Sequence, residues 1–417
     1  MTSRYAELSR EQLAVVVPEL LLTGHLIDRS GMAWALSAFG REGMTQIAIE
    51  EWAGASPVYT RRLQRALGFV GDDVPTIFKG MQLEIGAPPQ FMDMRYWVED
   101  AHHGGFHLDH CGALLDVEPM GEEHVRGMCH DIEDPTFDAT AVATNPRAQV
   151  RPVHRPPRTP VDRQPHCEWT VTIDESHPEV AAIPALALVQ ATRAAGLVLP
   201  DIDPSEDGAA DYSGPLVSDI DFTAFSHSAL VRIADEVCVQ MHLLVLSFQH
   251  AVRARAVDRA QADEIVTKQL TGIAGIMAER LCRALSLGED EHAALQVLAL
   301  HPLLNPAVYV EASFGADHVS VQPSSAHADE AWIARVSPTS VRPLQAVVQG
   351  VSPYLDVEVV GGDQDWTAQV VRRDTPAKEL DEVAVTRFSK GAGFAFSPRR
   401  SLPLTVVSHH EGSRCSA

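Results

Sequence analysis

Two segments stand out in this sequence, HLDHCGALLDVEP at residues 107–119 and MCHDIEDPTFD at residues 128–138. They lie within residues 102–167, which hold eight of the 19 histidines and three of the six cysteines. This region has few clear helix or strand patterns, and it gathers thiols, imidazoles and carboxylates. Such a composition is typical of a functional site rather than of a packed core. We therefore expect the rest of the chain to be organised around it.

Soft and hard metal ligands are mixed in the two segments. His107, His110 and Cys111 are spaced i, i+3 and i+4, which brings their side chains close together on a helix and within a few ångströms on a strand. Thiolates and imidazoles together favour zinc or iron over magnesium or calcium. The spacing matches no standard zinc finger and no HExxH helix. The predicted ligands of this Zn or Fe site are His107, His110, Cys111, Cys129 and Glu133.

A metal-free interpretation uses the same region. Cys111 or Cys129 would be the nucleophile, His110 or His130 the base, and Asp109 or Asp131 would orient the imidazole. Neighbours in sequence seldom point at each other, so Cys129 would pair with His110 rather than with His130. A structural alternative also stays open, in which the thiols are buried small residues and the polar side chains cap helices. The catalytic candidates are Cys111, Cys129, His130 and Asp131.

A loop rich in proline and arginine follows at residues 139–166, with six prolines and five arginines. We expect only loop or polyproline structure there. Its arginines could hold a substrate carboxylate by paired hydrogen bonds, or they could neutralise the acidic residues 131–134. Arg147, Arg151, Arg155 and Arg158 are the candidates, and Arg155 and Arg158 are the predicted substrate-binding residues.

Helices are predicted on the N-terminal side of this region. Residues 8–22 have helical apolar spacing, a cap candidate in Ser9, and Pro18 to kink or split the run. Further helices are expected over residues 33–53 and 58–67. Within the central region, one helix is expected over residues 118–133 and should stop at Pro135. Residues 167–174 (CEWTVTID) alternate as a strand, with Cys167, Trp169, Val171 and Ile173 on one side.

The C-terminal half has a different pattern, in which long helical segments precede short strands. Residues 222–256 and 261–287 are periodic and predict an αα-hairpin, followed by a helix at 290–300 and by short strands and helices from residue 308 onward. We expect an α+β protein with a helical N-terminal segment, a compact α/β domain, the αα-hairpin and a small mixed α/β end. No internal repeat is apparent. The predicted divisions are residues 1–200, an acidic linker at 201–220, a helical region at 221–305 and an α+β region at 306–417.

Other chemistries have less support in the sequence. Asp235, Glu236, His242 and Glu279 suggest a di-iron site, but the Glu-x-x-His motif of such sites is missing from both helices. We therefore expect His242 and Cys238 to be core residues. No GxGxxG after a strand, P-loop or GxSxG motif occurs, so nucleotide, dinucleotide and serine-hydrolase functions have no motif to carry them.

Composition narrows the class of partner. The chain has 417 residues, 45% apolar content and a formal net charge of -23. An acidic surface repels phosphate, which argues against nucleic acid and anionic membranes as partners. The N-terminus has no secretory signal pattern, the apolar runs are too short to span a bilayer, and the cysteines lack paired spacing. We expect a soluble, cytoplasmic protein with a small-molecule substrate.

A family resemblance extends over residues 40–175. Its features are a helix with a tryptophan near its end (GREGMTQIAIEEW, residues 40–52), a cysteine followed about 18 residues later by Cys-x-Asp, an arginine-containing segment, and a cysteine that opens a strand. This order resembles the L-2-amino-thiazoline-4-carboxylic acid hydrolase-like family. The resemblance implies a compact α/β domain and hydrolytic opening of a C–N/C–S ring. The matching positions are Cys111, Cys129, Asp131 and Cys167.

Three functions remain open. The first is a metal-dependent hydrolase-like enzyme acting on a small carboxylated or heterocyclic substrate, with a metal-bound water or a thiolate as the nucleophile. The second is a non-heme iron oxidoreductase that uses the same ligands. The third is a non-catalytic metabolite-binding regulatory protein whose helical C-terminal region dimerises. Exposed apolar faces on the predicted αα-hairpin would favour a homodimer, although burial within the chain is the simpler explanation.

Overall fold

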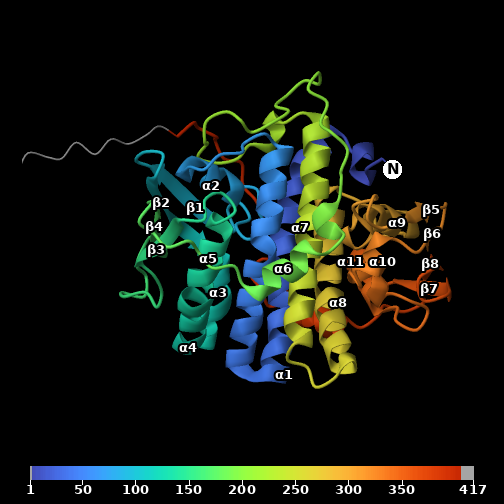
Figure 1. The fold of residues 1–417 in the computed structure, drawn as a ribbon. Helices are drawn as coiled ribbons and strands as arrows, with labels where there is room; N and C mark the ends of the chain where they lie inside the picture. The colour runs from blue at the N-terminus through green and yellow to red at the C-terminus, as the bar shows by residue number, and fades with distance from the viewer. Residues whose placement is uncertain (1, 405–417) are drawn as a thin grey trace, which may run out of the picture.

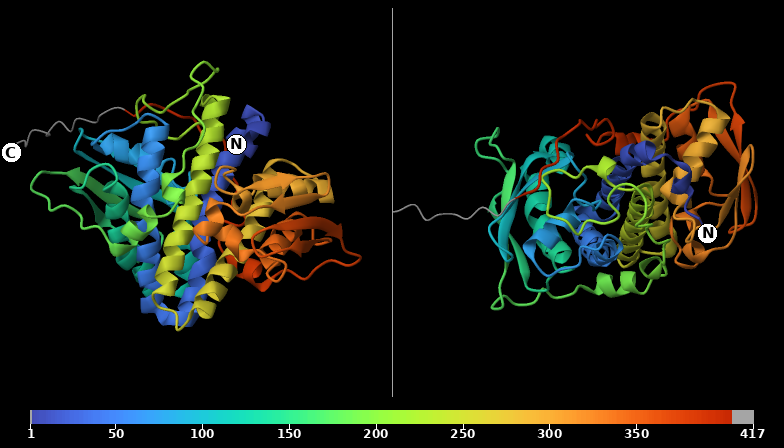
Figure 2. Two further views of the ribbon diagram at one scale, coloured as in Figure 1. Left: turned by 45° about the vertical axis from the view of Figure 1, so that its right-hand side comes forward. Right: turned by 90° about the horizontal axis from the view of Figure 1, so that it is seen from above.

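Long helices form the centre of the molecule in the computed structural model, which describes residues 2–404 (Figure 1). They are α1 (Arg10–Ala66), α7 (His227–Arg253) and α8 (Arg259–Ala284). Gly40 has φ 69° and ψ -178° and divides α1 into two arms that lie side by side (Figure 1). One four-stranded sheet lies on each side of these helices, as the view from above in Figure 2 shows. The predicted α+β class is confirmed.

Helix α1 begins where the sequence predicts, but it continues through positions at which the sequence predicts a break. Ser9 caps the helix, and Ser9 and Gln12 form a reciprocal capping box. Pro18 neither ends nor splits the helix, and the separate helices predicted at 33–53 and 58–67 belong to α1. Buried residues on both sides of Pro18, such as Val17 and Leu20, pack in the core, and this packing offsets the hydrogen bond that proline removes.

The first sheet holds β1 (Met92–Val98), β2 (His103–Cys111), β3 (Ala148–His154) and β4 (Cys167–Ile173), in the antiparallel order β1-β2-β4-β3. The predicted strand at 167–174 is confirmed, and its alternating residues are buried. The expectation of only loop or polyproline structure at 139–166 is wrong, because residues 148–154 pair with β4 as β3. In β2, the pairing shifts from Met94↔Leu108 to Met92↔Cys111. The extra residue in this bulge turns Cys111 towards the core, on the same side as Leu108.

Short helices connect β2 to β3: α3 (Gly112–Val117), η2 (Glu118–Met120), α4 (Glu122–Arg126), η3 (Gly127–Ile132) and α5 (Glu133–Ala141). The last three run on without a break, and η3 has π-helical hydrogen bonding. The prediction that Pro135 stops the helix is wrong. Pro135 falls in the first turn of α5, directly after the π segment, and the continuous helix runs through it.

The second half of the chain also forms a four-stranded sheet, with the same order of strands as the first. Its sheet contains β5 (Ala312–Phe314), β6 (His318–Val321), β7 (Leu355–Gly361) and β8 (Trp366–Arg372), in the order β5-β6-β8-β7. Each sheet thus has the strand order first, second, fourth, third, although the sequence shows no repeat. Of the short strands predicted from residue 308 onward, the first is β5, and residues 393–398 form no strand. The helices of this half are α9 (Glu291–Leu300), α10 (Ser325–Ala328), η7 (Trp332–Arg335), α11 (Arg342–Val351) and α12 (Asp381–Arg387).

The remaining short helices lie at the ends and in the connections. They are η1 (Arg4–Glu7), α2 (Val74–Met81), α6 (Pro184–Gln190), η4 (Ala194–Gly196), η5 (Phe222–Ala224) and η6 (Pro302–Leu304). The acidic segment 201–220 has no helix or regular strand. Within residues 2–404, no helix is both long and apolar enough to cross a membrane.

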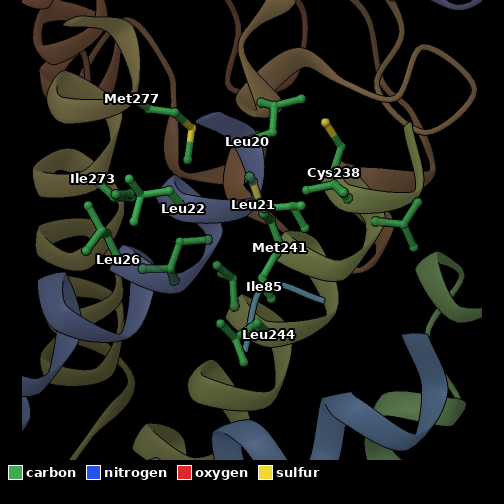
Figure 3. Close-up of a cluster of buried hydrophobic side chains, with 14 of the residues drawn as sticks. Leu20, Leu21, Leu22, Leu26, Ile85, Cys238, Met241, Leu244, Ile273 and Met277 are labelled. Carbon is green, nitrogen blue, oxygen red and sulfur yellow. The ribbon is translucent and has the colours of Figure 1, made fainter. Parts of the chain in front are cut away.

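The core lies where α1, α7 and α8 meet. Figure 3 shows leucines of α1 facing Met241 and Leu244 of α7 and Ile273 and Met277 of α8. Cys238 is fully buried in this cluster, as expected for a core residue. The apolar faces of α7 and α8 are thus covered by α1 within the chain.

The chain finally returns from the second half to the first. After α12, residues 388–404, which we term the C-terminal strap, run back towards the first sheet and appear in red near α2 in Figure 1. The Ser389 hydroxyl donates to Asp116 over 2.6 Å, and the Arg399 guanidinium binds the Asp93 carboxylate at 2.9 Å. Between these points, Phe394 packs against Phe91 at 5.4 Å between ring centroids. The strap therefore covers part of the N-terminal half.

Candidate functional site

An apolar cavity of about 620 Å³ lies between α1, the helices that follow β2, and the C-terminal strap. We term it the outer cavity. Its lining is rich in methionine and includes Trp52, and its polar groups include Asp28, Arg29 and Asp116. Methionine is flexible and adapts to ligands of varied shape. The methionines of the lining are Met32, Met44, Met120 and Met128.

A smaller space of about 90 Å³ adjoins it, with buried residues such as His25 and Glu84 in its lining, and we term it the inner chamber. Arg29, Trp52, Met128 and Ile132 line both spaces, so the two are adjacent. The inner chamber collects ionisable groups from different elements. His25 and Tyr59 come from the two arms of α1, Glu84 follows α2, and Glu133 begins α5.

Glu133 faces the inner chamber from the start of α5. Within residues 2–404, no group donates a hydrogen bond to its carboxyl. Burial raises the pKa of Glu133 to about 8, against the opposing charges of Arg155 and Arg29. The carboxyl is therefore largely protonated near neutral pH, and it can donate a proton into the chamber. Of the residues predicted as metal ligands, Glu133 alone lines this space.

Two further groups of the chamber are neutral. The Thr60 hydroxyl donates to Glu84 over 2.6 Å, and burial raises the pKa of Glu84 to about 8. His25 donates from Nδ1 to the Ile85 carbonyl at 3.2 Å, and its Nε2 is buried without a partner. Burial lowers the pKa of His25 to about 3, so the imidazole is uncharged. The chamber thus holds two protonated carboxyls and a neutral histidine at pH 7.

Arg29 is the cation at the junction of the two spaces. Its guanidinium lies 3.1 Å from the Asp28 carboxylate, and its Nε is buried without a hydrogen-bond partner. Burial opposes the charge, but the Asp28 and Asp116 carboxylates raise the pKa of Arg29 above its ordinary value. The permanently charged guanidinium lines both spaces, where it can bind an acceptor of a ligand.

The three cysteines of the region come together beside Glu133. Cys111 ends β2, Cys129 lies in η3 and Cys167 opens β4, and all three are buried. Burial raises the pKa of each thiol, to about 12 for Cys111, and the nearby Glu133 carboxyl adds to the shift. The thiol form therefore dominates at neutral pH. The Cys111 sulfur accepts from the Leu114 N–H at 3.3 Å, which caps α3.

The predicted histidines do not join this cluster. His107 lies 3.2 Å from Asp109 on the partly exposed side of β2. His110 donates from Nδ1 to the Phe91 carbonyl at 3.0 Å. His130 donates from Nε2 to the Pro156 carbonyl at 2.7 Å, which fastens the proline-rich loop to η3. Asp131 is exposed.

The predicted substrate-binding arginines are engaged elsewhere. Arg155 forms an ion pair with Asp134, and Arg158 binds Glu118 at 2.8 Å. These pairs fit the alternative in which the loop arginines neutralise acidic residues of the preceding helices. They also hold the proline-rich loop in place beside the cysteines.

The positions of these side chains can be compared with the predicted Zn or Fe site. In the described part of the chain, no group of three or more histidine, cysteine, aspartate or glutamate side chains is arranged to hold a metal ion. The proposed di-iron residues are likewise dispersed. Glu236 binds Arg62, His242 donates to the Asn305 carbonyl, and Glu279 pairs with Arg387.

Sequence reasoning missed His25, Arg29 and Glu84. His25 and Arg29 lie in the segment LLLTGHLIDRSG at residues 20–31, where polar residues interrupt a strongly apolar helical run. Polar residues inside such a run are candidates for a buried site, because burying them without a function or a partner is costly. Glu84 has no comparable signal, since it follows α2 in an irregular segment.

Comparisons of the chain with protein-family models, with curated proteins and with solved structures gave no match. The resemblance to the thiazoline-carboxylate hydrolase-like family therefore stays a prediction from the sequence.

Proposed function

We propose that this chain is a hydrolase-like enzyme that acts on a small carboxylated or heterocyclic substrate with a largely apolar body. The substrate body would occupy the outer cavity, and its reacting group would enter the inner chamber. The observation that carries the proposal is the Glu133 carboxyl, which faces the chamber without a hydrogen-bond partner and has a pKa near 8. Catalytic acids with a pKa near the working pH exchange protons most effectively.

The chemistry assigned to Glu133 is general acid catalysis. Its protonated carboxyl would donate a proton to the leaving nitrogen or sulfur while water attacks the adjacent carbon. The resulting carboxylate would then take up the proton that the attacking water releases, and so return to its starting form. Arg29 would bind the substrate carboxylate, or another acceptor, next to Asp28. Because the pKa of Cys111 is raised to about 12, the proposal favours Glu133 over a thiolate as the reacting group.

The first test is hydrolysis of a panel of five-membered cyclic amidine and thiazoline carboxylates, followed by NMR. Glu133→Gln keeps the shape of the side chain but removes the proton, and it should lower turnover by roughly 100-fold or more. Asp131→Asn is the matched control, because Asp131 lies on the same helix but is exposed. We expect Asp131→Asn to keep near-normal turnover. Full activity of Glu133→Gln, or loss of activity in Asp131→Asn alone, would contradict the assignment.

Zinc or iron remains part of the proposal as a prediction. Elemental analysis of protein purified without added metal or chelator tests it directly. Near-stoichiometric zinc that is lost in Cys111→Ser and Cys129→Ser variants would support a metal-dependent hydrolase. Iron together with oxygen consumption would support the oxidoreductase alternative. Turnover by metal-free protein would support acid catalysis by Glu133 without a metal.

A second candidate is a non-catalytic metabolite-binding protein. The observation that favours it is that Glu84, Glu133 and His25 in the chamber, and the thiols beside Glu133, are all uncharged near pH 7. Such a protein would bind an apolar anion such as 8-anilinonaphthalene-1-sulfonate in the outer cavity and release it to competing carboxylates without converting them. Tight competition with no turnover across the panel would support this candidate over the enzyme.

The proposed location is the cytoplasm. Cys111, Cys129, Cys167, Cys238 and Cys282 are all free thiols in the structure, which fits a reducing compartment. Homodimer formation stays a prediction, which light scattering of the purified protein would test.

A further inference from the structure

A third space of about 390 Å³, the polar pocket, lies on the other side of the inner chamber. Ala87, Met92 and Met94 line both spaces, so the same side chains separate them. The outer cavity borders the chamber at a different set of residues, Arg29, Trp52, Met128 and Ile132. The inner chamber therefore lies between two larger spaces.

The polar pocket differs chemically from the outer cavity. Its walls carry Asp93, Asp219 and Arg399, together with hydroxyl and amide side chains such as Ser218 and Gln90. The charges are paired, since Arg399 binds Asp93 at 2.9 Å and Arg95 binds Asp219 at 3.1 Å. Asp221 also lines the pocket, and its carboxylate accepts hydrogen bonds from the Thr223 N–H and hydroxyl. A wall of paired charges and hydrogen-bonded polar groups suits water and small uncharged polar molecules better than apolar ligands.

The partition between the polar pocket and the chamber consists largely of methionine side chains. Met92 and Met94 are 6% and 7% exposed and lie at the bulged end of β1 and β2. Tyr96 donates a hydrogen bond to the Met94 sulfur at 3.3 Å, and the Cys111 sulfur lies 3.9 Å from the Met92 sulfur. Methionine has three rotatable side-chain bonds, so such a partition can open by rotamer changes without movement of the strand.

We propose that the polar pocket is a second entrance to the inner chamber, closed by Met92 and Met94, which admits water and small uncharged polar molecules. Apolar ligands enter through the outer cavity instead. The use of this water as the hydrolytic reactant rests on the proposed function, but the route itself does not. The C-terminal strap borders both entrances, with Ser389 and Lys390 at the outer cavity and Arg399 at the polar pocket.

The test follows alkylation of Cys111 by iodoacetamide, a small uncharged polar reagent, in the native full-length protein. Peptide mass spectrometry gives the alkylation rate of Cys111 divided by that of Cys238, which we term the Cys111 ratio. The Cys238 sulfur lies in the core, 3.1 Å from the Tyr5 hydroxyl. Unfolding exposes both thiols, whereas opening of the partition exposes Cys111 alone. Met92→Ala should raise this ratio by about tenfold. Met92→Val is a milder variant that should raise it less.

Two plugging variants distinguish the routes. Thr223 and Ala33 are both exposed residues, and they line the polar pocket and the outer cavity respectively. In the Met92→Ala protein, Thr223→Trp should lower the Cys111 ratio at least about fivefold, whereas Ala33→Trp should change it less than about twofold. An unchanged ratio in both Met92 variants, or slowing by Ala33→Trp and not by Thr223→Trp, overturns the proposal. No substrate is needed, so failure of the proposed hydrolysis leaves this test intact.

Discussion

Glu84 and Glu133 are carboxyl groups that the fold keeps protonated near neutral pH. Burial raises the pKa of each from 4.5 to about 8, and Glu84 is only 2% exposed. A carboxyl with a raised pKa in the folded state stabilises the fold fully below its unfolded pKa. That contribution is lost as the pH rises from about 4.5 through 8. The folded protein should therefore become less stable across this range as these groups ionise.

The variant Glu84→Gln tests this linkage. Glutamine cannot ionise, but its carbonyl can still accept the hydrogen bond from Thr60. Between pH 5 and pH 9, the free energy of unfolding should fall by roughly 2–4 kcal/mol less in the variant than in the wild type. Urea denaturation at both pH values measures the difference. Equal pH dependence of the two proteins would show that Glu84 ionises normally in the fold.

At the scale of single elements, Gly40 decides the shape of α1. Its φ of 69° and ψ of -178° fall in a backbone region that is essentially restricted to glycine. The two arms of α1 can lie side by side because the helix breaks at this residue (Figure 1). An added Cβ at Gly40 would meet nothing within 4 Å, so any cost of substitution comes from the backbone alone.

Gly40→Ala should therefore destabilise the protein by about 1–3 kcal/mol. Gly127→Ala is the matched control, because Gly127 also has open space around its Cβ position but has helical φ and ψ of -52° and -46°. This second substitution should be neutral or should stabilise the helix by up to about 1 kcal/mol. Thermal or urea unfolding of both variants gives the comparison. Similar losses in the two proteins would argue against backbone strain at Gly40.

At the scale of the whole molecule, the two halves share one core. Arg62 of α1 binds Glu236 of α7 at 2.9 Å, and the two side chains are 6% and 2% exposed. Arg62 also donates to the Ala195 and Leu197 carbonyls, and these hydrogen bonds hold the residues that precede the acidic segment 201–220. Glu236 also pairs with Arg232 at 3.1 Å, so removing Arg62 takes away one of its two cations and the donor to two carbonyls, which is costly.

Arg62→Met should lower the free energy of unfolding by about 3–5 kcal/mol, and the double variant Arg62→Met/Glu236→Leu should recover part of this loss. The exposed pair Arg126 and Glu122 provides the control, with side chains that are 55% and 63% exposed. Arg126→Met should cost less than about 1 kcal/mol. We would follow both halves at once by hydrogen exchange. A loss of protection confined to α1 would mean that the halves unfold separately.

The sequence predicted part of the candidate site and missed another part, for identifiable reasons. It drew attention to Cys111, Cys129 and Cys167, which meet beside Glu133 because β2, η3 and β4 converge there. It could not separate the thiols and Glu133 from His130 and Asp131, because neighbouring residues of one helix point in different directions. It also missed Arg29 and His25, since only packing of α1 against η3 and α5 brings them to the same chamber as Glu133.

The sequence by itself determined the local features of this protein. The cap at Ser9, the alternation of β4, the helices α7, α8 and α9 and the α+β class follow from patterns that act over a few residues. The tertiary structure alone decided the continuation of helices through Pro18 and Pro135, the matching order of the two sheets, and the grouping of Glu133 with Glu84 and His25. These features depend on packing between residues far apart in the chain, and local patterns carry no record of those contacts.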